Sequence, residues 1–413
     1  MTPLSPDQHA AVDRAVNWYA TRRRLFFRLE GAAGTGKSST VRQIADKLAR
    51  GSTAYIAPTG KAAAVLRSKG CTDAGTIHSA IYAPAGERTA QIRALETQLA
   101  AIPMWQTKER EKLEQAIAKV KAQPIWTLRE PSKAFGGRKP NLLVLDEASM
   151  VDDRIFADLL SFGIPVLALG DPYQLPPVAG QAHWQSGQPD ALLSTIHRFG
   201  DTAPLIDLAT ALRNGRPAPR WNGTAGQTRN AWTPADLARY DQVIVGRNQT
   251  RWHIIEQLRD AAGREPGRPE PGDRIMVLRN DPDHDVVNGQ QATVLDAYEG
   301  DEGDWALTIR TDDGAVLPWP VDGRGFHGQA GQDEAKRDRD SGLIAATFAQ
   351  AITCHSAQGS QWPRVAVVDE ASAFRQAAAS WRYTAATRAE QACLILDPRR
   401  MIQRSRQYAR AAA

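Results

Sequence analysis

Residues 31–38 carry the most specific chemical signal in the chain. They read Gly-Ala-Ala-Gly-Thr-Gly-Lys-Ser and match the pattern G-x-x-x-x-G-K-[ST] of a phosphate-binding loop, or P-loop. An apolar run at 26–32 precedes them, and a helical pattern at 39–49 follows. Glycines let backbone N–H groups converge on phosphate oxygens, and the start of the helix adds partial positive charge. We therefore predict a nucleotide site in which Lys37 reaches the β- and γ-phosphates and Ser38 ligates Mg²⁺.

Two adjacent carboxylates follow another apolar run, since residues 142–147 read Leu-Leu-Val-Leu-Asp-Glu. This arrangement suits the hydrolysis of Mg²⁺·ATP, because Asp146 can hold the hydration shell of the metal and Glu147 can polarise the attacking water. A core strand followed by an acidic helix start would have the same sequence. The P-loop elsewhere in the chain favours the catalytic interpretation.

ATP hydrolysis also needs positive charge beside the γ-phosphate in the transition state. Arg198 lies in Thr-Ile-His-Arg-Phe at 195–199, and Arg388 lies in Tyr-Thr-Ala-Ala-Thr-Arg at 383–388. Arginines in surface ion pairs are common, so neither residue is specific by itself. Both are candidates for a charge supplied from a domain that faces the P-loop.

These residues must be positioned by a framework of strands and helices. Apolar runs that read as buried strands lie at 26–32, 54–58, 142–147, 166–171, 243–246, 351–355, 365–370 and 393–397. Their alternation with helical patterns indicates parallel sheets covered on both faces. Ligands of such sheets bind beyond the carboxyl ends of the strands, where the motifs of this chain fall. We predict an α/β fold with two similar units in tandem.

Two stretches break this alternation. From 84 to 140 the chain is charged and helical, and apolar residues at 92, 95, 99 and 102 share one face, as do those at 113, 117 and 120. This pattern predicts a helical hairpin, whose tail at 125–140 could form a projecting β-turn. From 271 to 326 the apolar period is two, with turn signals at 288–289 and 312–314, which predicts a small antiparallel barrel. Residues 327–341 read as a solvated, mobile loop.

Composition limits the class of protein. The chain has 413 residues, of which 42% are hydrophobic and 23% charged, close to globular averages. It has no apolar run of about 18 residues that would span a bilayer, and its start does not resemble a signal peptide. Three widely separated cysteines offer neither a zinc cluster nor a disulfide framework, so we expect a reducing cytoplasm. A net charge of +5 attracts polyanions without selecting one.

Further short motifs follow the predicted strands in order. They are Ala-Pro-Thr-Gly-Lys-Ala-Ala at 57–63, Gly-Thr-Ile-His-Ser at 75–79, Gly-Asp-Pro-Tyr-Gln-Leu-Pro-Pro at 170–177, Ile-Thr-Cys-His-Ser-Ala-Gln-Gly at 352–359 and Tyr-Thr-Ala-Ala-Thr-Arg-Ala at 383–389. Together with the P-loop and the Asp-Glu pair, this series resembles the motifs of superfamily 1 DNA helicases. The resemblance is closest to the superfamily 1B branch that includes the Dda and RecD enzymes, and it covers residues 4 to about 397.

The resemblance implies two RecA-like domains with ATP in the cleft between them. It also implies a strand-splitting pin inserted in the first domain and an SH3-like barrel inserted in the second. We expect the first domain at 1–83 and 141–185, its helical and pin insert at 84–140, the second domain at 186–270 and 343–413, and the barrel insert with its mobile loop at 271–342. Trp126 or Phe135 would supply an aromatic wedge for the pin, unless these rings pack in the core.

Site residues follow from the resemblance position by position. Gln8 matches the adenine-reading glutamine, Gln174 matches the γ-phosphate sensor, and Arg198 and Arg388 match the arginine fingers. The remaining ATP-binding positions are Gly34, Thr35, Gly36 and Gly359. Positions that match the single-strand path are Pro58, Thr59, Thr76, His78, Thr353, His355 and Ser356. Such hydroxyl and imidazole groups suit phosphate contacts that ignore base sequence, although an isolated histidine is more often a core residue.

The resemblance therefore implies an ATP-dependent, Mg²⁺-requiring DNA helicase that moves 5′→3′ on single-stranded DNA and unwinds duplexes at junctions, in replication, repair or recombination. We expect a monomer, because one chain supplies both faces of the cleft. An RNA-directed motor of the same superfamily and a nucleotide-switched nucleic-acid-binding protein without translocation remain alternatives. A subunit of a RecD-type nuclease complex is less favoured, because the P-loop already begins at Gly31.

Overall fold

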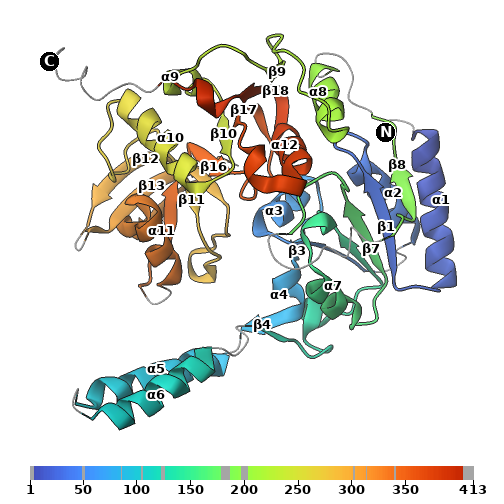
Figure 1. Cartoon of the computed structure of the whole chain (residues 1–413). Helices are drawn as coiled ribbons and strands as arrows, with labels where there is room; N and C mark the ends of the chain where they lie inside the picture. Colours follow the sequence, from blue (N-terminus) through green and yellow to red (C-terminus); the bar gives the residue numbers. More distant parts are fainter. Residues whose placement is uncertain are drawn as a thin grey trace.

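The computed structural model describes residues 4–48, 52–84, 86–103, 106–121, 126–177, 187–196, 203–300, 303–312, 314–338 and 341–402. Two parallel sheets lie side by side, and an antiparallel sheet flanks the second one (Figure 1). The α/β class predicted from alternating apolar runs and helical patterns is confirmed.

The first sheet has the strand order β3-β2-β6-β7-β1-β8 and is parallel throughout. Its strands are β1 (Phe26–Gly31), β2 (Thr53–Ala57), β3 (Gly75–Thr76), β6 (Leu142–Leu145), β7 (Val166–Gly170) and β8 (Ala191–Leu193). Helices α1 (Pro6–Thr21) and α2 (Lys37–Leu48) share a core with one face, and α4 (Ile77–Ile81) and α7 (Asp153–Leu160) share a core with the other. Because the central strands are covered on both sides, their sequences are continuous apolar runs.

Residues 191–193 belong to this sheet, whereas the sequence analysis assigned them to the second unit. They form β8, which pairs in parallel with β1 at the edge of the sheet. Asp190 fixes the register, because its carboxylate accepts the N–H of Arg28 at 2.9 Å and its own N–H donates to the Arg28 carbonyl at 3.0 Å. A run of three apolar residues is too short to be recognised by periodicity, so only the pairing reveals this strand.

The second sheet has the order β16-β10-β17-β18-β9 and is also parallel. Its strands are β9 (Ala225–Gln227), β10 (Gln242–Val245), β16 (Ala351–Thr353), β17 (Trp362–Val368) and β18 (Ala389–Leu396). The helices of this unit are α8 (Ala203–Arg213), α9 (Pro234–Leu237), α10 (Asn248–Ala261) and α12 (Ala378–Ala386). Leu175 of the first domain is buried in the core that α8 and α12 form with this sheet.

The third sheet is an antiparallel barrel with the order β14-β13-β12-β11-β15. Its strands are β11 (Arg274–Val277), β12 (Gln291–Glu299), β13 (Trp305–Thr311), β14 (Val316–Val321) and β15 (Ala346–Phe348). A bridge between Val321 and Ile344 brings the two outer strands together. The predicted antiparallel sheet is therefore present, and β15 extends it beyond the expected boundary at 342.

Residues 328–337 form helix α11 (Gly328–Arg337), where the sequence analysis expected a solvated loop. The side chain of Ala335 is fully buried beside Leu278 and Ala345. The Arg279 guanidinium donates to the carbonyl oxygens of Ala335 and Lys336, at 2.8 and 3.3 Å, and so caps the end of the helix. The glycines and charges of this segment resemble a loop, and these tertiary contacts stabilise a helix instead.

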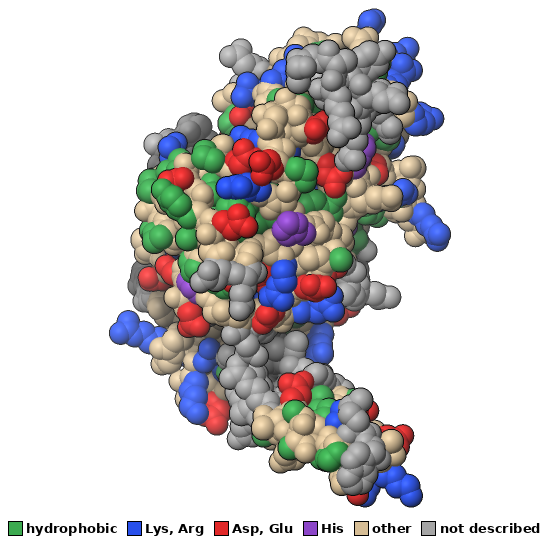
Figure 2. Space-filling model, turned by 90° about the vertical axis from the view of Figure 1, so that its left-hand side faces the viewer, with side chains coloured by type: hydrophobic (Ala, Val, Ile, Leu, Met, Phe, Trp, Pro, Cys, Tyr) green, Lys and Arg blue, Asp and Glu red, His purple; other side chains and the backbone are tan. Residues whose placement is uncertain are grey.

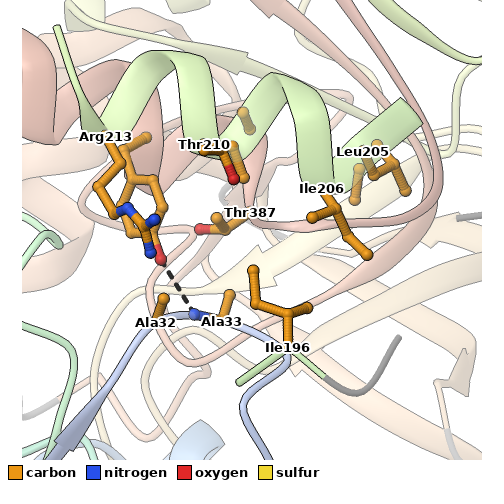
Figure 3. A pocket seen from close by; sticks show the side chains of 12 residues that line it. Ala32, Ala33, Ile196, Leu205, Ile206, Thr210, Arg213 and Thr387 are labelled. Carbon is orange, nitrogen blue, oxygen red and sulfur yellow. Dashed lines mark hydrogen bonds between the residues drawn. The ribbon is translucent and has the colours of Figure 1, made fainter. Parts of the chain in front are cut away.

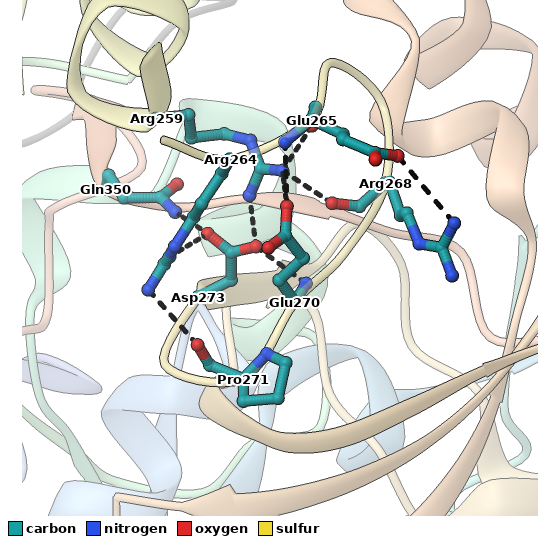
Figure 4. A network of polar contacts seen from close by, with 8 residues as sticks. All are labelled: Arg259, Arg264, Glu265, Arg268, Glu270, Pro271, Asp273 and Gln350. Atoms are coloured by element: carbon teal, nitrogen blue, oxygen red, sulfur yellow. Dashed lines mark hydrogen bonds and ion pairs between the residues drawn. The ribbon is translucent and has the colours of Figure 1, made fainter. Parts of the chain in front are cut away.

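A buried ion network attaches the barrel to the second domain (Figure 4). The carboxylate of Asp273 is fully buried and pairs with Arg259 and Arg264. It also accepts a hydrogen bond from Gln350 Nε2 at 2.6 Å. Asp273 precedes β11 and Gln350 follows β15, so one carboxylate ties both connections between the barrel and the α/β unit.

The insert of the first domain is an arm that projects away from the two sheets (Figure 1). Strands β4 (Tyr82–Pro84) and β5 (Trp126–Leu128) form its base, and helices α5 (Gly86–Ala101) and α6 (Thr107–Lys121) lie along each other. Residues 134–137 form a tight turn in which Phe135 and Gly136 are left-handed, with φ values of +53° and +68°. The ring of Phe135 packs edge-on against that of Phe162, with 5.6 Å between the ring centres. Core packing therefore accounts for Phe135, and the side chain of Trp126 lies outside the described residues.

Candidate functional site

The P-loop leaves β1 and enters α2 at Lys37. Gly34 and Gly36 have φ values of +85° and +76°, a left-handed conformation that glycine adopts without steric cost. The Lys37 ammonium donates to the carbonyl oxygens of Gly31 at 2.6 Å and Ala32 at 3.1 Å, so it folds over the loop. The loop and the first turn of α2 form the helix N-terminus that binds phosphate in such motifs, while the Ser38 side chain lies outside the described residues.

Gln8 is buried at the start of α1 and contacts the P-loop. Its Nε2 donates to the Thr35 carbonyl at 3.1 Å, and its Oε1 accepts the N–H of Ser5 at 3.0 Å. The adjacent Asp7 accepts the N–H groups of Ser194 and Thr195, both at 2.9 Å. Burial alone would raise the pKa of Asp7, but these bonds and the Ser5 hydroxyl hold it below its ordinary value. The start of α1 thus supports the loop, and adenine recognition by Gln8 remains a prediction.

Asp146 and Glu147 follow β6 directly. Asp146 Oδ1 accepts the N–H of Glu147 at 2.9 Å, and Glu147 has a φ of +51°, which is uncommon outside glycine. Burial and the charge of Asp146 raise the pKa of Glu147, whereas the charges of Arg388 and Lys37 lower it. Within the described residues, the Glu147 carboxylate has no hydrogen-bond or ion-pair partner. Glu147 therefore lies within electrostatic range of the P-loop lysine of one domain and the arginine of the other.

The residues at this position fit a Mg²⁺ ion. The described part of the chain contains no group of three or more His, Cys, Asp or Glu side chains arranged around a metal. Mg²⁺ at nucleotide sites keeps several waters and uses one or two protein ligands together with substrate phosphates. Asp146 has one oxygen bonded to the backbone, and its other oxygen has no partner among the described residues. Asp146 and the predicted Ser38 hydroxyl would complete that small donor set.

Arg388 follows α12 and is buried in the second domain. Its Nε donates to the Thr384 carbonyl at 3.1 Å, and its Nη1 donates to the Ser360 carbonyl at 3.3 Å. These neutral partners leave its positive charge uncompensated, so the charge acts on Glu147. Arg198, the other predicted arginine finger, lies outside the described residues.

Tyr383 links the two domains beside the P-loop. Its hydroxyl donates to Asp171 Oδ2 at 2.8 Å and accepts the N–H of Ala33 at 3.0 Å. Asp171 follows β7 of the first domain, whereas Tyr383 lies on α12 of the second. The sequence analysis listed Tyr383 within a motif and gave it no role of its own.

The loop after β7 makes a second link. The N–H of Leu175 donates to Thr384 Oγ1 at 2.8 Å, and the Leu175 carbonyl accepts Gln358 Nε2 at 3.2 Å. Gln174 lies between Asp171 and Leu175, and its buried Oε1 has no hydrogen-bond partner among the described residues. Gln174, the predicted γ-phosphate sensor, therefore lies between Asp171 and Leu175, the two residues through which the loop is hydrogen-bonded to the second domain. A buried acceptor without a partner, such as its Oε1, is uncommon in proteins.

A pocket of about 440 Å³, including the part open to solvent, lies between α8, α12 and the P-loop (Figure 3). Ala32 and Ala33 form one wall, and mostly apolar side chains of the second domain form the other. Arg213 lies at one end, with its guanidinium 5.1 Å from the centre of the Tyr173 ring. The crevice therefore continues from the P-loop into the second domain, and Arg213 is a cation that sequence reasoning did not identify.

The predicted strand-path residues of the first domain follow neighbouring strands. Pro58 and Thr59 follow β2, and Thr76 and His78 lie at the end of β3 and in α4. Thr59 Oγ1 accepts the N–H of Ala62 at 3.1 Å and so caps α3 (Gly60–Ser68). Thr76 Oγ1 accepts the N–H of Ser79 in the same way at 3.0 Å. Because β2 and β3 are adjacent and parallel, these residues share one edge of the sheet.

The corresponding residues of the second domain lie at the end of β16. Thr353 Oγ1 is 3.0 Å from Ser356 Oγ, and His355 lies between them in sequence. Gly359 has a φ of +73°, and a Cβ there would lie 3.3 Å from Ala62 Cβ and 3.6 Å from Thr59 Oγ1. Gly359 of the second domain therefore lies beside Thr59, a predicted strand-path residue of the first. Gly359, which the resemblance places near the nucleotide, lies against the start of α3.

Both path histidines are partly exposed and pack beside aromatic rings. The ring centres of His78 and Tyr82 are 5.1 Å apart, and those of His355 and Phe374 are 5.9 Å apart. Burial lowers the pKa of both histidines, and only for His78 does a carboxylate, that of Asp152, act in the opposite direction. The imidazoles are therefore neutral at pH 7, and a neutral imidazole carries one N–H donor.

Family models match both halves of the chain. One described as an AAA domain matches residues 3–231, more than half of the chain, and one described as a UvrD-like helicase C-terminal domain matches residues 348–396. The chain belongs to the superfamily 1B helicases. The suspected family is thereby confirmed.

Individual relatives agree with this assignment. The ATP-dependent RecD2 DNA helicase of Deinococcus radiodurans is 26% identical over 94% of this chain, which spans only 48% of that relative. The ATP-dependent DNA helicase Pif1 of Bdellovibrio bacteriovorus is 25% identical over 86% of this chain and 80% of its own length. Among solved structures, Bacteroides Pif1 bound to single-stranded DNA has a TM-score of 0.53 and 15% identity, and the match covers all of this chain and 96% of that one. This structural likeness supports the tandem RecA-like fold.

The barrel of the helicase contacts the start of α3. A Cβ at Gly60 would lie 2.6 Å from Val287 Cβ, so a side chain there would collide with the barrel. Beside it, the Lys61 ammonium lies 4.7 Å from the centre of the Trp362 ring, and burial lowers the pKa of Lys61 to about 8. The first domain, the barrel and the second domain therefore meet at the start of α3. From the sequence alone this region was recognised only as a short motif.

On the face shown in Figure 2, Lys and Arg side chains alternate with Asp and Glu side chains rather than separating into fields of one sign. Among the described helices, none is long and apolar enough to cross a membrane.

Proposed function

We propose that this helicase hydrolyses ATP in the crevice between its two α/β domains. Lys37 would hold the β- and γ-phosphates, Glu147 would polarise the attacking water, and Arg388, with Arg198, would stabilise charge in the transition state. Mg²⁺, held by Asp146 and Ser38, would neutralise phosphate charge. The observation that carries the proposal is the contact across the crevice: the P-loop N–H of Ala33 donates to Tyr383 at 3.0 Å, on the helix whose Thr384 carbonyl holds Arg388.

The energy of hydrolysis would drive movement along single-stranded DNA. Thr59 of the first half of the strand path lies beside Gly359 of the second domain, and the neighbouring Gln358 donates to the Leu175 carbonyl in the links that join the nucleotide motifs. A change in domain spacing at the γ-phosphate would therefore change the spacing of the phosphate contacts. Bacteroides Pif1, which shares this fold, has been solved bound to single-stranded DNA, and this supports single-stranded DNA as the ligand. We propose 5′→3′ movement by a monomer, because one chain supplies both faces of the crevice.

The ATP site is tested by Lys37→Ala. Turnover of ATP should fall at least about 100-fold, because a cation at the transferred phosphate is lost, while binding of an oligonucleotide should persist. Lys47→Ala is the matched control, since Lys47 is an exposed lysine on the same helix. Wild-type turnover in Lys37→Ala would show that the site is wrongly assigned.

Movement and polarity are tested by displacement of streptavidin from biotin at either end of a single-stranded oligonucleotide. The proposal expects ATP-dependent displacement from the 3′ end only. Displacement from neither end, together with nucleotide-dependent binding, would identify a switched clamp instead. Comparing ATPase stimulation by DNA and RNA oligonucleotides of one sequence separates the DNA motor from the RNA motor, because the 2′-OH is the main distinguishing group. Removal of Mg²⁺ with EDTA should abolish turnover.

A further inference from the structure

The peptide group between Ala32 and Ala33 is held from both domains. Its carbonyl oxygen accepts the Lys37 ammonium at 3.1 Å and the Thr35 hydroxyl at 2.9 Å, both within the P-loop. Its N–H donates to the Tyr383 hydroxyl of the second domain at 3.0 Å (Figure 3). The two ends of one planar amide group are therefore bonded to the nucleotide lysine and to a residue of the opposite domain.

The proton positions along this chain of bonds are fixed by the environment. Burial, followed by the charge of Asp171, raises the pKa of Tyr383, so its hydroxyl stays protonated at neutral pH. It donates its proton to Asp171 Oδ2 at 2.8 Å and must accept the proton of Ala33. Both Tyr383 and Asp171 are about 1% exposed, so water cannot readily replace either partner. Hydrogen bonds in such a buried series polarise one another.

Thr384, the residue after Tyr383, is hydrogen-bonded both to the loop after β7 and to Arg388. Thr384 Oγ1 accepts the N–H of Leu175 at 2.8 Å, and the Thr384 carbonyl accepts Arg388 Nε at 3.1 Å. One turn of α12 thus holds the P-loop, the loop after β7 and Arg388 in fixed relation.

We propose that Tyr383 is the positioning residue that couples phosphate binding at the P-loop to the DNA affinity of the helicase. The inference rests on the proposed function, in which Lys37 leaves the Ala32 carbonyl to bind phosphate. When it leaves, the Ala32–Ala33 amide loses the charge that polarises it, and its bond to Tyr383 changes. Tyr383 transmits that change to Asp171 and, through α12, to the second half of the strand path.

The test compares Tyr383→Phe with Tyr173→Phe. Tyr173 is the matched control, because its ring lies 5.9 Å from that of Tyr383 while its hydroxyl has no partner among the described residues. For each protein, the affinity for a fluorescent oligonucleotide is measured without nucleotide and with a non-hydrolysable ATP analogue. The ratio of the two affinities reports coupling and is insensitive to a uniform loss of stability.

In the wild type we expect the analogue to change DNA affinity by about 10-fold, within the usual range of coupling between sites. Tyr383→Phe should reduce the ratio to within about 2-fold of unity while still binding the analogue, and Tyr173→Phe should keep the wild-type ratio. An unchanged ratio in Tyr383→Phe, or equal losses in both variants, would overturn the inference. A wild type without any nucleotide effect on DNA affinity would overturn the proposed function as well.

If Tyr383→Phe folds poorly, Asp171→Asn tests the hydrogen bond between Tyr383 and Asp171 from the other side. It should also reduce the ratio, and the double variant should lose no more than the stronger single variant, because both changes break one connection. Additive losses would mean that the two residues act separately, which the inference excludes.

Discussion

Two segments with the same sequence, Asp-Glu-Ala-Ser, occur at 146–149 and 369–372. Each follows the third strand in the order of its parallel sheet, β6 in the first and β17 in the second. The surroundings of the two acidic pairs nevertheless differ in almost every contact. The comparison shows how position in a fold decides whether a carboxylate can take part in chemistry.

In the second segment every acidic group has a partner within the protein. Glu370 accepts the N–H groups of Gly246 and Arg247 at 2.8 and 3.0 Å and the hydroxyl of Thr250 at 2.6 Å, so it caps the start of α10. Asp369 pairs with Arg382 on α12 at 2.9 Å. In the first segment, Glu147 has no partner among the described residues, and its raised pKa reflects burial next to Asp146.

The helices that face these segments explain the difference. In the first domain the helix after the neighbouring strand β2 is α3, which is capped by its own Thr59. In the second domain the helix after the neighbouring strand β10 is α10, which has Glu370 at its N-terminus. A buried anion at a helix start is satisfied by backbone N–H groups and the helix dipole, so Glu370 stabilises the domain. Glu147 has no such partner among the described residues, which is what its proposed role in polarising the attacking water requires.

The largest contrast is expected in ATP turnover. Glu147→Gln should lower kcat by about 10²–10⁴-fold, the usual contribution of a general base, because an amide cannot polarise the attacking water. Glu370→Gln should change kcat by less than about 3-fold, because its role is structural. DNA-stimulated ATPase assays at saturating ATP measure both. Similar losses in the two variants would remove the distinction between the segments.

A smaller contrast is expected in the requirement for Mg²⁺. Asp146→Asn should raise the Mg²⁺ concentration for half-maximal turnover by about 10–100-fold, since it weakens the interaction with the ion and its waters. Asp369→Asn should leave that concentration unchanged, because its carboxylate already pairs with Arg382 at 2.9 Å. Mg²⁺ titrations of ATPase activity at fixed ATP distinguish these outcomes, and equal Mg²⁺ curves for the two variants would contradict the assignment of Asp146.

For the free energy of unfolding, substitutions in the second segment should have the larger effect, the reverse of what is expected for turnover. Glu370→Ala removes the acceptor for two N–H groups and a hydroxyl, and should cost about 1–2 kcal/mol, the upper range for loss of a helix cap. Glu147→Ala should cost nothing or stabilise the protein, because it removes a partly buried carboxylate that has no partner among the described residues. Urea denaturation followed by circular dichroism measures both. A larger loss in Glu147→Ala would mean that this residue has a structural partner after all.

The same contrast explains what the sequence could and could not predict. The central strands were predictable because burial on both faces leaves long apolar runs, and the P-loop and the Asp146–Glu147 pair were predictable because each is contiguous. The strand β8 was missed because three residues give no periodicity, and α11 was read as a loop because only the contacts of Ala335 and Arg279 stabilise it.

The links between domains were the least predictable part of the site. Tyr383 and Asp171 are separated by 212 positions, and no local pattern indicates that a tyrosine will donate to that carboxylate. Likewise, the local sequence does not distinguish the second Asp-Glu pair from the first, because both lie in the sequence Asp-Glu-Ala-Ser. Its partners, Gly246, Arg247 and Arg382, come from other elements that the fold brings together.

The smallest effect concerns the histidines that each sheet contributes to the predicted strand path. Because burial lowers the pKa of His78 and His355, both are neutral at pH 7.5 in the free protein. A DNA phosphate favours the charged form, so binding should take up protons, and DNA affinity should rise a few-fold between pH 7.5 and about pH 6, bounded by 10-fold per pKa unit. The free protein should become less stable as the pH falls, because the unfolded chain binds these protons more readily.

Fluorescence anisotropy at constant ionic strength measures the affinity. In the double variant His78→Asn and His355→Asn the pH dependence should disappear, and an undiminished slope there would place the DNA away from both imidazoles.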